Sequence, residues 1–144
     1  MRILGLDLGA RRIGVALSDP SAWLATPLTV LSCSSRKAEL AAIEELVHQH
    51  QVERVIVGYP LSLNGRVGPQ AQRVEKYVSQ IRKRLQVPVI LWDERLSTAQ
   101  AERLIHEAGK RVRRERIDAA AAAVILQSYL NAQSPATETQ RNCH

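Results

Sequence analysis

The sequence predicts an α/β fold in which a mixed five-stranded sheet is flanked by helices. Two apolar runs, residues 3–8 and 13–17, are separated by about four residues, which favours a hairpin of antiparallel strands. Further along, a helical pattern over residues 36–50 precedes a short apolar run at 53–58. A strand–helix–strand order implies a parallel crossover, so a sheet with both connections is mixed.

The first strand carries one acidic residue within an otherwise apolar run. Such a run is typical of a strand that is covered on both faces. Asp7 lies at its end, where open α/β sheets often bind ligands, and a carboxylate buried there is costly unless it is paired or bound to a cation. Asp before Gly is also a common turn residue that bonds its own backbone. The first strand alone leaves both interpretations open.

The remaining elements follow from periodicity and from turn residues. A third strand is expected over residues 23–31, with Pro27 indicating an edge or a bulge, and a helix is expected to begin at Pro69. A strand over 87–92 is followed by a capping-box pattern at 97–100, which opens a helix that Gly109 closes. The last helix, predicted over 117–130, is rich in alanine and can approach the sheet closely.

Length and composition limit the class of protein. The 144 residues predict one domain over residues 1–131 and a flexible polar tail over 132–144. A net charge of +6 favours a polyanionic partner, and an aromatic content of 3% argues against a binder built on stacking platforms. Cys33 and Cys143 lie far apart, which argues against a disulfide. With no leader or long apolar segment, the expected location is the cytoplasm.

Acidic residues recur at the ends of three predicted elements. Asp7 ends the first strand, Asp93 and Glu94 end the last strand, and Asp118 opens the last helix. Strand ends of one sheet cluster in space, and the usual compensation for clustered carboxylates is a hard cation such as Mg²⁺. Two such ions about 4 Å apart stabilise both the attacking and the leaving oxygen of a phosphodiester. Adjacent strand residues point to opposite faces, so only one of Asp93 and Glu94 is expected to face the site.

Each acid also has a purely structural interpretation. Asp118 could be an N-cap or a dipole partner of its helix, worth about 1 kcal/mol. Glu94 could pair with Arg95 or Arg103 at the surface. Three acids at three element ends together favour a shared site over three separate structural roles.

Basic residues surround these acids in the sequence. Arg11 and Arg12 follow Asp7, Arg66 lies in a Gly-Tyr-Pro loop, and a basic run precedes Asp118. Such residues hold phosphates mainly through sequence-independent contacts, although a solvated charged loop is the alternative for the run. The predicted nucleic-acid-binding residues are Arg11, Arg12, Arg66, Arg95, Lys110, Arg111, Arg113, Arg114 and Arg116.

Four ordered blocks of the chain resemble the YqgF/RuvX family. They are Gly5-Leu-Asp-Leu-Gly9 with Arg12-Ile-Gly-Val-Ala16, Gly58-Tyr-Pro-Leu61 with Gly65, Asp93-Glu-Arg-Leu-Ser-Thr-Ala99 with Ala101-Glu102, and Asp118-Ala-Ala-Ala-Ala122 with Ile125-Leu-Gln127. The resemblance implies a ribonuclease-H-like fold and a cytoplasmic nuclease that trims the 5′ end of precursor 16S ribosomal RNA. The family is also similar to the Holliday junction resolvase RuvC.

Carried onto this chain, the resemblance implies that Asp7, Glu94 and Asp118 are the catalytic, metal-binding acids, with Mg²⁺ or Mn²⁺ as the cofactor. The departures are small and remove no carboxylate: Arg11 stands where lysine is frequent, Tyr59 where leucine is frequent, and Ser97 where threonine is usual. RuvC-like resolvases carry a second acid one turn along the last helix. Alanines occupy that turn here, which weakens the resolvase interpretation.

The resulting hypothesis is a metal-dependent endonuclease that acts on structured RNA as a monomer or weak homodimer. In this hypothesis water attacks the phosphorus of the RNA backbone, and the products carry a 5′-phosphate and a 3′-hydroxyl. One rival is a resolvase of branched DNA, which predicts a stable dimer. Another is a nucleotide-binding protein, because Asp-Leu-Gly resembles the phosphate loop of actin and sugar-kinase ATPases, but 144 residues leave no room for their second lobe. A third is a non-catalytic RNA-binding ribosome-assembly factor, which would not require the acids.

Overall fold

The computed structural model describes residues 2–9, 11–32, 34–62, 64–94 and 114–133, with side chains in the last range from Ala119 onward. Within these ranges the strands form one five-stranded sheet with the order β3-β2-β1-β4-β5. Its strands are β1 Arg2–Leu8, β2 Ile13–Ser18, β3 Ala25–Leu31, β4 Val52–Tyr59 and β5 Val89–Asp93. Because β1 pairs antiparallel with β2 and parallel with β4, the predicted mixed sheet is confirmed.

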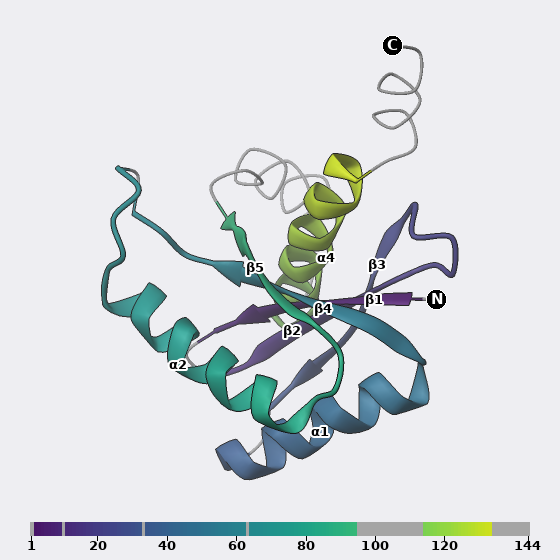
Figure 1. Ribbon diagram of the computed structural model, residues 1–144, viewed down its shortest axis with the longest axis horizontal. Helices are drawn as coiled ribbons and strands as arrows, with labels where there is room; N and C mark the ends of the chain where they lie inside the picture. The colour runs from purple at the N-terminus through teal and green to yellow at the C-terminus, as the bar shows by residue number, and fades with distance from the viewer. Residues whose placement is uncertain (1, 10, 33, 63, 95–113, 134–144) are drawn as a thin grey trace.

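Helices cover both faces of this sheet (Figure 1). One face carries α1 (Arg36–Gln49) and α2 (Pro69–Arg84), and the other carries α4 (Arg114–Ala132). The Ser35 side chain caps α1 by accepting from the Ala38 N–H at 3.1 Å, and Pro69 begins α2 as predicted. The resulting three layers place β1 in the middle of the sheet, with a helix layer on each side.

The residues of β1 alternate between two apolar clusters. Leu4 and Leu6 are fully buried against α1 and α2, whereas Ile3 is buried with α4. This confirms that the first apolar run is a strand covered on both faces. Burying one leucine side chain contributes roughly 2 kcal/mol to the stability of the fold. The part of the strand that precedes Asp7 is therefore held by packing on both faces.

Small residues let α4 lie close to β1. A Cβ added at Gly5 would lie 2.8 Å from the Leu126 Cβ and 3.2 Å from the Ala122 carbonyl oxygen. Those distances leave no room for any side chain at position 5. The prediction that the alanine-rich helix approaches the sheet closely is therefore confirmed.

The β3 strand is an edge strand with the irregularity that Pro27 predicted. Val15 pairs with Thr29 and Ala16 pairs with Pro27, so Leu28 is passed over and forms a bulge. The strand begins at Ala25 rather than Trp23, because the Asp19 carboxylate accepts the N–H groups of residues 23 and 24. Those groups are therefore engaged in a turn and not in the sheet.

Two other predicted boundaries are corrected. The β5 strand begins at Val89 instead of residue 87, because Pro88 has no N–H to donate to a neighbouring strand. The last helix already includes Arg114, three residues before the predicted start at Ile117, so part of the predicted basic connector is helical. Arginine and glutamate are good helix formers, but charged residues give no apolar periodicity by which to recognise them. Asp118 is therefore inside the helix and is not its N-cap.

The predicted helix closed by Gly109 and the end of the polar tail lie outside the described residues. The division into a domain of residues 1–131 and a tail of 132–144 stays a prediction, although α4 includes Ala132. No helix in the described ranges is long and apolar enough to cross a membrane.

Candidate active site

Asp7 and Glu94 meet at one edge of the sheet. The strands β1, β4 and β5 are parallel, so their C-terminal ends lie at the same edge. Along β1, Asp7 shares its face with Gly5, which packs against α4. Glu94 directly follows β5 and shares a face with Trp92, which also belongs to the α4 cluster. Both carboxyl groups therefore lie on the α4 side of the sheet.

The two carboxyl groups are hydrogen-bonded to each other, and the pKa of Glu94 is raised from 4.5 to about 7. The largest cause is the burial of Glu94, followed by the charge of Asp7 and the hydrogen bond between them. The charge of Asp93 raises this pKa further. Below pH 7 the protonated Glu94 donates to Asp7, so one proton offsets the repulsion between two acids.

Gly58 makes this contact possible. It lies on β4, between the strands that carry the two acids. A Cβ added at Gly58 would lie 2.6 Å from the Glu94 Oε1 and 2.7 Å from the Ile125 Cδ1. The Glu94 side chain therefore occupies the space that a side chain at position 58 would fill. No role for Gly58 was predicted from the sequence, although a glycine directly after a buried Val-Ile-Val run is a signal of close approach.

Of the adjacent acids at 93 and 94, Glu94 is the one that contacts Asp7. Val89 and Leu91 pack with α1 and α2, so the alternation places Asp93 on that face. Glu94 makes the direct hydrogen bond with Asp7, and Asp93 acts on Glu94 through its charge.

The direction of α4 places its beginning towards the same edge of the sheet. Near the start of β1, Ile3 pairs with Arg54, whose Nη1 donates to the Tyr129 hydroxyl at 2.6 Å. Further along β1, Gly5 lies against Ala122, one turn after Asp118. The two elements therefore run in opposite directions, and the end of β1 that carries Asp7 lies towards the beginning of α4, where Asp118 is located. The side chain of Asp118 lies outside the described residues, and the described side chains include no group of three that could hold a metal ion.

The predicted basic residues are only partly described. Arg11 is exposed and Arg12 is half-buried in the turn after β1, which the Gly9 N–H closes by donating to the Arg12 carbonyl oxygen at 2.9 Å. Arg66 is exposed in the loop that leaves the C-terminal end of β4. Arg114 and Arg116 are part of the α4 backbone, and their side chains lie outside the described residues. The residues wholly outside are Arg95, Lys110, Arg111 and Arg113.

A family model and named relatives match nearly the whole chain. The model of the RuvX family, described as a Holliday junction resolvase, matches residues 1–132. A protein of Desulforudis audaxviator named "Putative pre-16S rRNA nuclease" is 47% identical over 141 residues, which cover 96% of this chain and 100% of that protein. A protein of the same name from Caldanaerobacter subterraneus subsp. tengcongensis is 46% identical over 136 residues, covering 92% of this chain and 98% of that protein.

Solved structures of resolvases share the fold. RuvC of T. thermophilus, in complex with a Holliday junction substrate, superposes with a TM-score of 0.64 at 16% identity and covers 93% of this chain and 97% of its own. The Fowlpox virus resolvase with its Holliday junction DNA gives a TM-score of 0.57 at 12% identity, covering 92% and 99%. The predicted ribonuclease-H-like fold is confirmed by this likeness.

Proposed function

The chain belongs to the RuvX family, and from that membership and the Asp7–Glu94 pair we propose that it is a metal-dependent nuclease that processes the 5′ end of precursor 16S ribosomal RNA. The members of this family are hydrolases of phosphodiester bonds. The single observation that carries the proposal is the contact between two carboxyl groups at the C-terminal edge of the parallel strands.

The donor set fits a hard divalent cation. Asp7 and Glu94 offer carboxylate oxygens, which Mg²⁺ and Mn²⁺ prefer, and a cation that displaces their shared proton would offset the same repulsion. We place Asp118 as the third ligand, since α4 begins towards this edge. Bound there, the metal would supply charge stabilisation and a nucleophile at neutral pH.

The remaining residues act on the substrate strand. Arg11 and Arg12 lie in the turn directly after Asp7, where their guanidinium groups would hold backbone phosphates beside the acids. The basic segment before α4 and Arg66 would extend this phosphate-binding surface. Cleavage by water leaves a 5′-phosphate on one fragment and a 3′-hydroxyl on the other.

The RNA substrate is proposed from the relatives. Two that are 46–47% identical are named for precursor 16S ribosomal RNA, and this chain covers them almost completely. A basic chain of +6 suits a polyanion, and the location that matches the substrate is the cytoplasm.

The test is cleavage of a precursor 16S 5′-leader RNA by the wild type and by Asp7→Asn, with Mg²⁺, with Mn²⁺ and with chelator. We expect metal-dependent cleavage that Asp7→Asn reduces by about 10³-fold or more, while RNA binding and thermal stability are retained. Asp93→Asn is the matched control, because it removes a neighbouring acid from the other face of the sheet and should retain most activity. Normal cleavage by Asp7→Asn would show that the site is wrongly assigned.

A second candidate, resolution of branched DNA, is favoured by the description of the family and by the likeness to RuvC. A four-way DNA junction in the same assay separates the two. Symmetric paired nicks in the junction, made by a stable dimer, would support the resolvase, because two cuts need two sites. Tight RNA binding with no cleavage of either substrate would instead support an assembly factor.

A further inference from the structure

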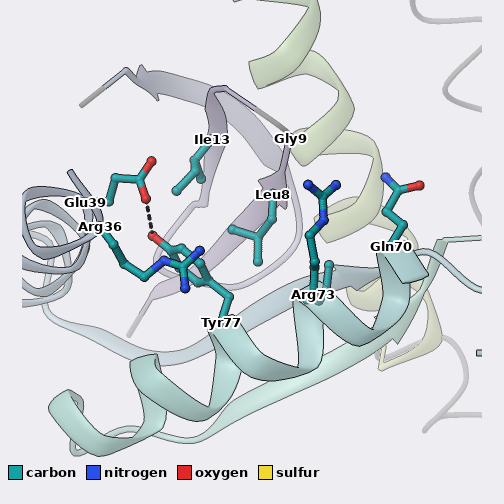
Figure 2. Close-up of a pocket in the computed structure, with 9 residues that line it drawn as sticks. Leu8, Gly9, Ile13, Arg36, Glu39, Gln70, Arg73 and Tyr77 are labelled. Carbon is teal, nitrogen blue, oxygen red and sulfur yellow. Dashed lines mark hydrogen bonds between the residues drawn. The ribbon is translucent and has the colours of Figure 1, made fainter. Parts of the chain in front are cut away.

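A small pocket lies on the opposite face of the sheet from the two acids. Its volume is about 100 Å³, and it lies where α1 and α2 meet the turn after β1 (Figure 2). Leu8, the residue after Asp7, lines this pocket and packs with the α1 and α2 cluster. Asp7 and Leu8 thus point to opposite faces, and the pocket is reached from the acids by crossing one edge of the sheet.

Two guanidinium groups from different helices line the pocket. Arg73 comes from α2, and within the described chain it makes no hydrogen bond or ion pair. Arg36 comes from the first turn of α1, and its guanidinium carbon lies 5.1 Å from the centroid of the Tyr77 ring. This cation–π contact fixes the group while leaving its N–H donors available to a ligand.

The other polar groups of the pocket are compatible with an anion. The Glu39 carboxylate also lines it and accepts from the Tyr77 hydroxyl at 3.0 Å. The pocket is therefore lined by two positive guanidinium groups and by one carboxylate, which already accepts a hydrogen bond from Tyr77. Figure 2 shows Gln70 and Arg73 projecting from α2 on the same side, and both line the pocket.

The size of the pocket suits a single small oxyanion group. A volume of about 100 Å³ corresponds to roughly three water molecules at ~30 Å³ each. A phosphate group is of that order, whereas a nucleoside is several times larger. Planar guanidinium groups match the oxygens of a phosphate with paired hydrogen bonds, so a phosphate is the ligand whose chemistry suits the lining.

The turn after β1 connects the pocket to the acids. Gly9 lines the pocket and follows Asp7 by two residues, which is about 7 Å of extended chain. A Cβ added at Gly9 would lie 2.7 Å from the Arg12 carbonyl oxygen, so a glycine keeps this turn tight. A nucleic-acid strand bound at the acids can therefore cross the edge here and bring a phosphate, a few nucleotides away, to the pocket.

We propose that the pocket between α1 and α2 binds a non-scissile backbone phosphate of the substrate strand through Arg36 and Arg73. This proposal rests on the proposed function for the identity of the strand, but its binding test does not require cleavage. The pocket would fix the register of the strand relative to the acids, as a phosphate contact does without reading sequence.

The test measures binding of the leader RNA to the Asp7→Asn protein, which does not cut it, and to this protein with Arg73→Gln, Arg36→Gln or Lys76→Gln added. Lys76 is the matched control, because it is an exposed cation on α2 that does not line the pocket. We expect Arg73→Gln and Arg36→Gln to raise the Kd about 3- to 10-fold and to lower the slope of log K against log salt by about 0.7. Lys76→Gln should change neither, and thermal midpoints check that each variant folds.

A set of RNAs that each carry one neutral methylphosphonate locates the contact. In the parent protein, one position near the cleavage site should weaken binding, and Arg73→Gln should remove that dependence, as a double-mutant cycle requires. Equal losses in Arg73→Gln and Lys76→Gln would overturn the proposal in favour of diffuse charge. Inorganic phosphate that stabilises the parent protein, with RNA binding unchanged in Arg73→Gln, would overturn it in favour of a free oxyanion. If the wild type cuts no RNA, the binding results still decide this proposal separately.

Discussion

The two faces of the sheet are packed in different ways. The α1 and α2 face is filled by large side chains such as Leu4 and Leu6, and its helices stand off from the strands. On the α4 face, Gly5 and Ala122 allow the helix to approach β1 almost to backbone contact. The face that carries α1 and α2, called the wide face below, leaves room for a pocket at its edge. The face that carries α4, called the close face below, holds two acids against each other. The large residues of β1 therefore face the side with the pocket, and its small residue Gly5 faces the side with the two acids.

The largest expected effect comes from reversing the sizes of the side chains on the two faces. Leu6→Ala leaves a cavity on the wide face and should lower the free energy of unfolding by about 3 kcal/mol. Gly5→Val should cost a similar amount, because even its Cβ would lie 2.8 Å from the Leu126 Cβ. Urea denaturation measures both. Gly68→Ala is the control, since nothing lies within 4 Å of an added Cβ there. A tolerated Gly5→Val would contradict the close packing of α4.

The second effect is a pH dependence on the close face. The pKa of Glu94 is about 7 in the folded chain without metal and 4.5 unperturbed, so its stabilising effect is complete below pH 4.5 and is lost as the pH rises through 7. In chelator, the free energy of unfolding should fall by about 2 kcal/mol over this range, a value discounted for the partial exposure of Glu94. Glu94→Gln should remove this decline. An unchanged decline in Glu94→Gln would assign the titration to another group.

The third effect tests whether the position of the Glu94 carboxyl group matters when both carboxyl groups are kept. Gly58→Ala keeps both carboxyl groups but places a Cβ 2.6 Å from the Glu94 Oε1. We expect cleavage to fall at least tenfold, which is about 1.4 kcal/mol of barrier, with about 1–2 kcal/mol lost from the free energy of unfolding. Steady-state cleavage and urea denaturation measure the two losses. Activity equal to that of Gly68→Ala would mean that Glu94 reaches its position without the space at Gly58.

The smallest expected effect lies on the wide face. Ser35→Ala removes the side-chain cap of α1 next to Arg36 and should cost about 1 kcal/mol of stability. Ser34→Ala, one residue earlier and outside the capping position, should cost much less. Thermal denaturation of the two variants gives the difference, and equal midpoints would show that the cap contributes nothing to α1.

The sequence was sufficient to predict the hairpin, the mixed sheet and the position of Asp7 at the end of its strand. These follow from short-range patterns of apolar residues and turns. The beginning of α4 could not be predicted, because a charged run has helix propensity without apolar periodicity. The Glu94–Gly58 contact and the pocket arginines could not be predicted either. In the sequence, Arg73 resembles Arg82 of the same helix, but only the fold shows that Arg82 donates to the Val89 carbonyl oxygen while Arg73 lines the pocket.

The strand order has a consequence for synthesis of the chain. Asp7 is in a hairpin whose pairing is local and can form within microseconds, whereas Glu94 arrives only when β5 docks beside β4. The nascent chain therefore carries the first acid long before the second, and α4 is the last of the described elements to be translated. The reactive pair can therefore form only after the first 94 of the 144 residues have been translated.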